Sequence, residues 1–122
     1  MVTAPVAEVL EGITRDTVIT LAHDLGYIVL EQPISRDQLY IADEVLVCGT
    51  AAEVIGLREI DFRKIGAGTS GPVTRRLQQA FSEVVRGRHA RSKEWLAHVA
   101  MPESASQIPL PRTDSATRPG VA

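Results

Sequence analysis

Residues 10–26 read LEGITRDTVITLAHDLG, and this stretch decides how the rest of the chain is arranged. Its apolar side chains recur at the helical spacing i, i+3, i+4 and i+7, at Val18, Leu21, Ala22 and Leu25. Thr14 stands where the N-cap of a helix belongs, and Gly26 supplies the left-handed residue that commonly ends one. The stretch therefore predicts a helix over 15–25 with one apolar face.

The segments around this helix predict an α/β fold. Ser35 and Gln38 have the spacing of a capping box, and Pro72 suits a first helical position. The expected elements are a loop at 1–9, a helix at 15–25, a strand at 27–32, a helix at 36–42, a buried strand at 44–49, a strand at 52–60, a return at 61–64, a loop at 66–71, a helix from Pro72 to Gly87, and a short helix near 92–98. This order predicts a mixed sheet of three or four strands, flanked by helices, with at least one unpaired edge.

Composition and length indicate a single small domain. The chain has 122 residues, and we place the folded part at 1–99. Residues 100–122 are rich in Pro, Ser, Thr and Arg and carry little apolar surface, so we expect a disordered tail there.

Cysteine usage and hydropathy indicate the compartment. Cys48 is the one cysteine of the sequence and cannot form a disulfide within the chain, which favours a reducing environment. The sequence has no apolar run of the roughly 18 residues that a membrane helix needs. Its N-terminus also lacks the pattern of a signal peptide. We expect a cytoplasmic protein with no membrane partner.

The net charge of −2 hides an asymmetry between the two halves of the chain. Residues 1–61 hold 11 acidic and 3 basic side chains, and residues 62–122 hold 4 acidic and 10 basic ones. A basic half can attract nucleic acid, but this one lacks the interleaved aromatic residues that stack on bases. A solvated helix face is the preferred interpretation, and we expect no nucleic-acid partner.

Side chains with the chemistry of metal ligands do not cluster in the sequence. His23, His89 and His98 are not spaced as metal ligands, and Cys48 has no neighbouring Cys or His. We therefore predict no metal site and no catalytic residue from these groups.

Two short constellations carry possible binding chemistry. Gly12-Ile13-Thr14 opens the first helix, where unpaired backbone N–H groups and the helix dipole favour an anion. An ordinary helix cap is the alternative interpretation. The run 48–52, Cys-Gly-Thr-Ala-Ala, follows a predicted strand, and ligands of open α/β sheets bind at strand ends. A tight turn built of small residues is the alternative there.

Three blocks of the sequence resemble successive signatures of branched-chain aminotransferases, which belong to the fold-type IV pyridoxal phosphate enzymes. The blocks are LEGITRDTVITLAHDLGY, ISRDQLYIADEVLVCGTAAEV and GPVTRRLQQAF, and their order and gaps also match. The resemblance covers about 8–99 and implies the C-terminal part of a class IV aminotransferase cofactor-binding large domain. The Gly-Thr-Ala-Ala-Glu run separates this subfamily from D-amino acid aminotransferases and aminodeoxychorismate lyases, which share the fold.

The resemblance implies cofactor-binding roles for the first constellation. Ile13 and Thr14 would bind the phosphate of pyridoxal 5'-phosphate, and Gly12 would let the anion approach the backbone. Leu10 would pack on the pyridine ring. Helix-start donors and a hydroxyl suit a phosphate dianion.

The resemblance also implies roles for the second constellation. Thr50 would touch the cofactor phosphate, and the backbone at Gly49, Thr50 and Ala51 would hold the carboxylate of the substrate. Paired backbone N–H groups suit such a carboxylate.

Several departures from the family matter for activity. The family binds its cofactor covalently through a lysine that lies before the first block, and neither Lys64 nor Lys93 matches it. The acidic partner of the pyridine nitrogen and an arginine for the phosphate also lie upstream in the family. Ile55-Gly56 replaces the usual Thr-Pro, and Phe62 replaces a turn glycine. We therefore expect a truncated chain that is inactive alone.

The resemblance implies transfer of an amino group between Leu, Ile or Val and 2-oxoglutarate. The partners would be a small amino acid, a 2-oxo acid, and either a missing N-terminal part or further copies of the chain. Two alternatives remain open at this stage. One is a non-catalytic module that binds a phosphate ligand or a subunit, and the other is a different class IV enzyme, such as a D-amino acid aminotransferase or an aminodeoxychorismate lyase.

Overall fold

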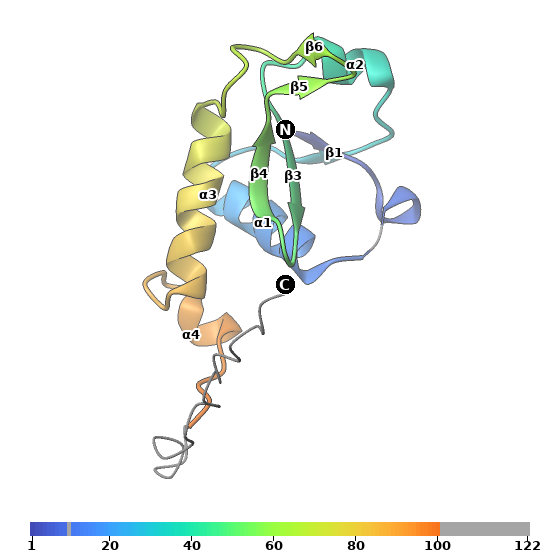
Figure 1. Cartoon of the computed structure of the whole chain (residues 1–122). Helices are drawn as coiled ribbons and strands as arrows, with labels where there is room; N and C mark the ends of the chain where they lie inside the picture. The colour runs from blue at the N-terminus through green and yellow to red at the C-terminus, as the bar shows by residue number, and fades with distance from the viewer. Residues whose placement is uncertain (10, 101–122) are drawn as a thin grey trace, which may run out of the picture.

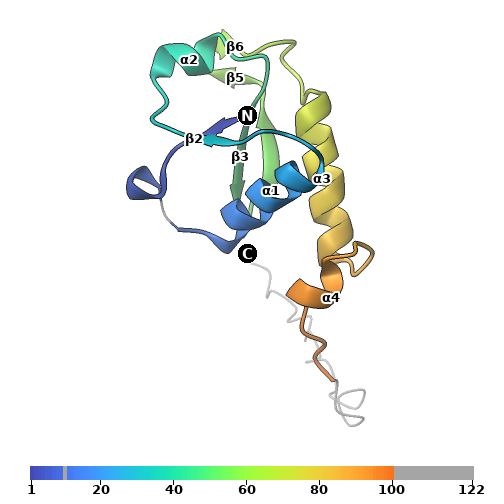
Figure 2. The same cartoon turned by 180° about the vertical axis from the view of Figure 1, so that it is seen from behind.

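The computed structural model describes residues 1–9 and 11–100, and its centre is a β-hairpin with two helices on one face (Figures 1 and 2). The hairpin joins β3 (Val45–Gly49) to β4 (Glu53–Leu57), and the helices are α1 (Ile13–Asp24) and α3 (Pro72–Val85). Helices packed on strands confirm the expected α/β class.

The core lies between this face of the hairpin and the two helices. Its buried members are Val18, Leu21, Ala22, Val54, Leu77, Ala80 and Val84. Leu46 and Cys48 of β3 pack against this cluster from the hairpin side. The core is therefore aliphatic, and the apolar spacing of α1 is confirmed because three of its four expected positions, all but Leu25, are buried.

The opposite face of the hairpin carries no helix among the described residues. Val47 pairs with Ile55 across the two strands, and their side chains are 44% and 45% exposed. The strand expected at 44–49 is confirmed as β3, but the expectation that it is buried was wrong. Alternate residues of a strand point to opposite faces, so a hairpin covered on one side keeps half of its apolar side chains outside.

The strands of the described residues are shorter and more numerous than expected. β1 (Val2–Thr3) pairs in parallel with β2 (Leu30–Glu31), and β5 (Glu59–Ile60) pairs antiparallel with β6 (Arg63–Lys64). With β3 and β4 they form three separate two-stranded ladders.

The bounds of three expected segments were wrong, because the observed strands are shorter and more numerous. The expected loop at 1–9 contains β1 and the 3-10 helix η1 (Val6–Glu8), and the strand expected at 27–32 is reduced to β2. The strand expected at 52–60 is interrupted by a bend at Arg58. β1 and β2 are neighbours in space but lie far apart in sequence, so local propensity did not reveal their pairing.

The helix ends follow local rules with one exception. Gly26 and Gly87 have φ values of +83° and +75° and end α1 and α3 as expected. Pro72 is the first residue of α3, and Ser35 forms the expected capping box at the start of α2 (Arg36–Tyr40). Thr14 is not an N-cap. That position belongs to Gly12, whose extended backbone precedes a helix that begins at Ile13.

The short helix α4 (Ser92–Trp95) is fastened to both long helices. Arg91 donates two hydrogen bonds to the carboxylate of Asp24 at the end of α1, at 2.5 and 2.8 Å. These bonds and the positive charge lower the pKa of Asp24. Ser92 donates its hydroxyl hydrogen to the carbonyl of Val84 at 2.9 Å. α4 is shorter than the helix expected near 92–98.

Residues 101–122 lie outside the described residues, so the expected disordered tail stays a prediction. Within the described part of the chain, every helix is too short or too polar to span a lipid bilayer.

Glu44 joins the start of the hairpin to the start of α3. Its carboxylate accepts hydrogen bonds from the backbone N–H groups of Val73 and Thr74 at 3.1 and 2.9 Å, and from the Thr74 hydroxyl at 2.7 Å. Burial alone would raise the pKa of Glu44, but these bonds and the charge of Arg75 outweigh burial and lower it. A negative charge at a helix N-terminus is stabilising.

We expect Glu44→Gln to lower the free energy of unfolding at pH 7 by about 1 kcal/mol, because a charged cap becomes a neutral one. The pKa of Glu44 is lower in the folded than in the unfolded chain. Its contribution is therefore complete above the unfolded value and disappears as pH falls through the folded value. Urea unfolding between pH 7 and pH 3 measures both effects.

The neighbouring exposed carboxylate provides the matched control for this experiment. Asp43→Asn removes the same charge one residue away, where no side-chain hydrogen bond to the described residues is made. The Glu44 variant should have a lower free energy of unfolding at pH 7, and that free energy should fall less steeply between pH 7 and pH 3. The Asp43 variant should match the unmodified chain in both respects. Equal behaviour of the two variants would contradict the capping role.

Candidate functional site

The first turn of α1 presents backbone donors without acceptors. Gly12 has no side chain to cap the helix, and the first helical bond runs from the N–H of Asp16 to the Gly12 carbonyl at 3.1 Å. The N–H groups before Asp16, from Ile13 to Arg15, have no acceptor among the described residues. The positive end of the helix dipole adds to this donor set, so the turn is suited to an anion.

The turn between β3 and β4 lies beside the first turn of α1, as both views show (Figures 1 and 2). Thr50 and Ala51 are exposed in this turn. A Cβ built on Gly49 would meet no atom within 4 Å, so the backbone there is open to an approaching group. The two constellations singled out in the sequence are therefore at the same end of the molecule.

Electrostatics supports the same proximity. Burial raises the pKa of the Cys48 thiol, and the positive charge of Arg15 acts on it in the opposite direction. Cys48 lies near the end of β3 and Arg15 in the first turn of α1, and these two elements contact each other. A raised pKa keeps the thiol protonated and unreactive at neutral pH.

Arg15 is the cation closest in sequence to these donors, but other groups hold its guanidinium. It donates to the Ala4 carbonyl at 2.8 Å and to the Glu31 carboxylate at 2.7 Å. These bonds tie α1 to the β1–β2 ladder. The charge of Arg15 is thus largely neutralised within the fold, and sequence reasoning did not assign it any role.

The structure places most of the predicted site residues and leaves one out. Ile13 is 89% exposed, and Thr14 is partly buried at the first turn. Leu10 lies outside the described residues, so its expected packing on a cofactor ring stays a prediction. No group of three or more acidic, His or Cys side chains within the described ranges is arranged to hold a metal ion.

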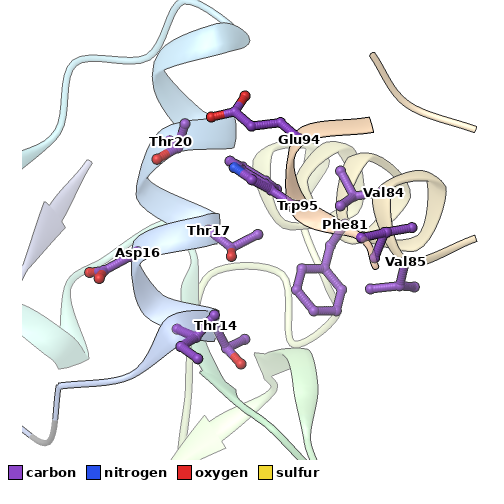
Figure 3. A pocket seen from close by; sticks show the side chains of 11 residues that line it. Thr14, Asp16, Thr17, Thr20, Phe81, Val84, Val85, Glu94 and Trp95 are labelled. Atoms are coloured by element: carbon purple, nitrogen blue, oxygen red, sulfur yellow. The ribbon is translucent and has the colours of Figure 1, made fainter. Parts of the chain in front are cut away.

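A groove of about 600 Å³ lies between α1, α3 and α4, and sequence reasoning did not predict it. In Figure 3, Phe81, Val84 and Val85 from α3 and Trp95 from α4 face the threonines of α1. Thr14, Thr17 and Thr20 recur every three residues on this side of α1, which is the sequence signal for the wall. Asp16 and Glu94 are the acidic residues in the lining.

Comparison with known proteins identifies the family. The model of the "Amino-transferase class IV" family matches residues 1–60. A branched-chain-amino-acid aminotransferase of Pseudomonas aeruginosa is 50% identical over 93 residues, which are 76% of this chain and 30% of that protein. The chain is therefore similar to class IV aminotransferases, and to branched-chain-amino-acid aminotransferases in particular. The resemblance seen in the sequence is thus confirmed.

Solved structures of class IV aminotransferases agree with this assignment. The branched-chain amino acid aminotransferase of Escherichia coli has 46% identity and a TM-score of 0.75 over 80% of this chain and 32% of that one. The holo form from Thermobaculum terrenum, which holds pyridoxal phosphate, has 43% identity and a TM-score of 0.78 over 82% and 33%. The expected fold class, part of a class IV aminotransferase large domain, is confirmed. The chain spans about 30% of the length of the curated relatives it matches.

We expect the two threonines of the candidate site to contribute equally to anion binding. Thr14→Ala and Thr50→Ala should each weaken the binding of inorganic phosphate a few-fold, because each removes a hydroxyl donor that contributes about 1 kcal/mol. Backbone amide shifts during a phosphate titration measure the effect. Shifts at Ile13, Thr14 and Thr50 together would support an assembled site.

An exposed threonine elsewhere provides the control. Thr69→Ala changes the loop before α3 and should leave phosphate binding unchanged. Shifts confined to 75–93 would instead show general attraction to the basic residues of α3 and α4, and would count against the site.

Proposed function

We propose that this chain supplies the cofactor-phosphate and substrate-carboxylate part of a branched-chain amino acid aminotransferase. The reaction would transfer an amino group between Leu, Ile or Val and 2-oxoglutarate. The observation that carries the proposal is the 50% identity to a branched-chain-amino-acid aminotransferase, in a chain whose α1 start and β3–β4 turn lie together. Named relatives of this one type favour it over a D-amino acid aminotransferase or an aminodeoxychorismate lyase.

The residues present fit the phosphate end of pyridoxal 5'-phosphate. The uncapped N–H groups of Ile13 and Thr14 offer donors to a dianion, and the hydroxyls of Thr14 and Thr50 offer two more. Leu10 would lie against the ring. When bound, the cofactor supplies an electron sink for amino-group transfer.

The residues of the β3–β4 turn would orient the substrate. The backbone N–H groups at Thr50 and Ala51 would hold the substrate carboxylate, and Gly49 leaves space for it because no atom lies where a Cβ would be. Binding by backbone groups fixes the carboxylate without restricting the side chain of the amino acid. This would account for one site that accepts several branched-chain substrates.

Neither lysine of the chain is placed to bind the cofactor. Lys64 is on β6, which lies at the opposite end of the hairpin from the β3–β4 turn (Figures 1 and 2). Lys93 is on α4 and is not among the residues that line the groove. We propose that the covalent lysine comes from another polypeptide segment, which would cover the outer hairpin face at Val47 and Ile55.

A non-catalytic module that binds a phosphate-bearing ligand is the second candidate. One observation favours this candidate. The described residues offer backbone donors for a phosphate but no lysine amine beside those donors. Under this alternative, phosphate binding would persist while no segment in trans would restore catalysis.

We expect the chain alone to form no glutamate from leucine and 2-oxoglutarate with added pyridoxal 5'-phosphate. The physical reason is the absence of an amine near the phosphate donors among the described residues. Adding the part of the Pseudomonas aeruginosa relative that this chain does not match, as a separate polypeptide, should produce turnover. Coupled assay of glutamate formation measures both conditions.

Two further measurements distinguish the proposed aminotransferase part from a non-catalytic module: the Thr50→Ala variant and the assay of the chain alone. Thr50→Ala should raise the concentration of pyridoxal 5'-phosphate needed for half-maximal turnover a few-fold, because it removes a hydroxyl donor to the phosphate, and it should leave the KM for leucine nearly unchanged, because the backbone N–H groups remain. Turnover of about 1 per second or more by the chain alone would overturn the proposal. A stable mixture that binds phosphate but never turns over would favour the non-catalytic module.

A further inference from the structure

The first turn of α1 lacks the two supports that usually hold the start of a helix. Gly12, the N-cap residue, has no side chain that could accept a hydrogen bond from the turn. The buried residues of α1 begin only at Val18, and Ile13 at the first helical position is 89% exposed. A terminal turn that is neither capped nor packed frays readily. Another contact is therefore needed to order the turn that carries the phosphate donors.

The side chain of Arg15 supplies that contact. Its Nη2 donates to the Ala4 carbonyl at 2.8 Å and to the Glu31 carboxylate at 2.7 Å, and these acceptors lie 11 and 16 residues away in sequence. The side chain is only 12% exposed. Its Nε is buried and has no acceptor among the described residues, so the Nη2 bonds fix where the guanidinium lies. Hydrogen bonds from a charged donor to a carboxylate are among the stronger ones.

The acceptors of Arg15 belong to a ladder that is itself held together. Ala4 follows β1, and Glu31 is the last residue of β2. The two strands pair in parallel, and backbone hydrogen bonds of 3.0 Å from Leu30 and Gln32 join the segment of β2 to that of β1. The first turn of α1 is thus fastened to a neighbouring ladder instead of being capped from within.

This arrangement keeps the backbone donors of the turn available. A capping side chain at position 12 would accept from the N–H of Thr14 or Arg15, and would use a donor that a phosphate needs. The guanidinium of Arg15 carries only donors and directs them at the ladder. It therefore holds the turn without occupying the N–H groups at 13–15, which have no acceptor within the described part of the chain.

The charge of Arg15 is largely compensated where the side chain lies. The Glu31 carboxylate is 2.7 Å from Nη2, and the Asp16 carboxylate is 3.7 Å from Nη1. Two nearby carboxylates offset the attraction that one guanidinium would exert on a phosphate. The contribution of Arg15 to anion binding is therefore to order the turn.

We propose that Arg15 is a positioning residue of the phosphate site, which holds the uncapped first turn of α1 in the conformation that binds the phosphate. The inference rests on the proposed function, because that function places the cofactor phosphate at this turn. Donors that are ordered before binding lose less entropy when the anion arrives. Loss of the Arg15 contacts should therefore weaken phosphate binding, although the guanidinium itself is bonded to the ladder.

A titration of the full chain with inorganic phosphate, followed by backbone amide shifts, tests Arg15→Met. Methionine keeps a long unbranched side chain and removes the donors. Phosphate should bind about tenfold more weakly. The amide hydrogen of Asp16, bonded to the Gly12 carbonyl at 3.1 Å, should exchange several-fold faster in the absence of phosphate. Unchanged affinity, or weaker binding with unchanged exchange at Asp16, would overturn the inference.

The variant Glu31→Ala separates the position of Arg15 from its charge. It removes one acceptor of the guanidinium and leaves the positive charge less compensated. A positioning role predicts that phosphate binds about threefold more weakly, because the turn is held less firmly. Tighter binding would show that Arg15 acts by attracting the phosphate, and would overturn the inference. This variant keeps Arg15, so it provides a result even where Arg15→Met does not fold.

A variant of restored stability separates a local role from a general loss of stability. Phe62 has a φ of +62° in the turn between β5 and β6 and is 99% exposed, so Phe62→Gly relieves backbone strain and gives up no burial. The double variant of Arg15→Met and Phe62→Gly should unfold at a higher temperature than Arg15→Met and bind phosphate equally weakly. Recovery of phosphate affinity together with stability would count against a positioning role.

Arg36 provides the matched control. Its guanidinium also lies near a carboxylate, that of Asp61 at 3.7 Å, but α2 lies beside β5 and β6, at the opposite end of the hairpin from the β3–β4 turn (Figures 1 and 2). Arg36→Met removes the same charge and should leave phosphate binding unchanged, and equal weakening by both variants would overturn the inference. Phosphate binding that survives Arg15→Met removes this inference alone. An unmodified chain without phosphate shifts at the first turn of α1 and at Thr50 removes the phosphate site of the proposed function as well.

Discussion

The capping of α3 by Glu44 is the constraint on which the rest of the structure depends. The carboxylate lies one residue before β3, and it binds the first turn of a helix that begins 28 residues later. This contact sets the start of α3 against the start of the hairpin, and the burial of Leu77 and Val84 sets the rest. α1 packs on the same face of the hairpin through Val18, Leu21 and Ala22, so the cap fixes where α3 starts and the aliphatic core places α1 beside it.

A hairpin covered on one side has two kinds of consequence. The covered face supplies an aliphatic core. The other face leaves Val47 and Ile55 exposed, beside strand edges that pair with no further strand in the part of the chain that the structure describes. Two strands bury too little surface to be independently stable, so such a unit depends on what packs against it. In this chain α1 and α3 provide one cover, and the free face is suited to another polypeptide segment. The family relationship and the exposed face thus lead to the same expectation by separate routes.

Phe62 shows where local rules and observed structure disagree. An Asp in the left-handed region at position 61 is ordinary, but a phenylalanine beside it is not. The hydrogen bond from Tyr40 and the stacking of Arg63 hold the turn in place, and they do so without covering the aromatic ring.

The sequence by itself determined the α/β class and the helices, because helical spacing, Gly and Pro positions and the Ser35 capping box act within a few residues. It also singled out the residues of the candidate anion site, whose binding stays a prediction. The sequence did not predict three features that depend on contacts between residues far apart in the chain. These are the β1–β2 pairing, the exposed half of β3 and the groove lined by Trp95. The N-cap at Gly12 was also missed, since Thr14 is the better cap by propensity alone. Only the tertiary structure decided these points, because long-range packing chooses which face of a strand is covered and which donors stay free.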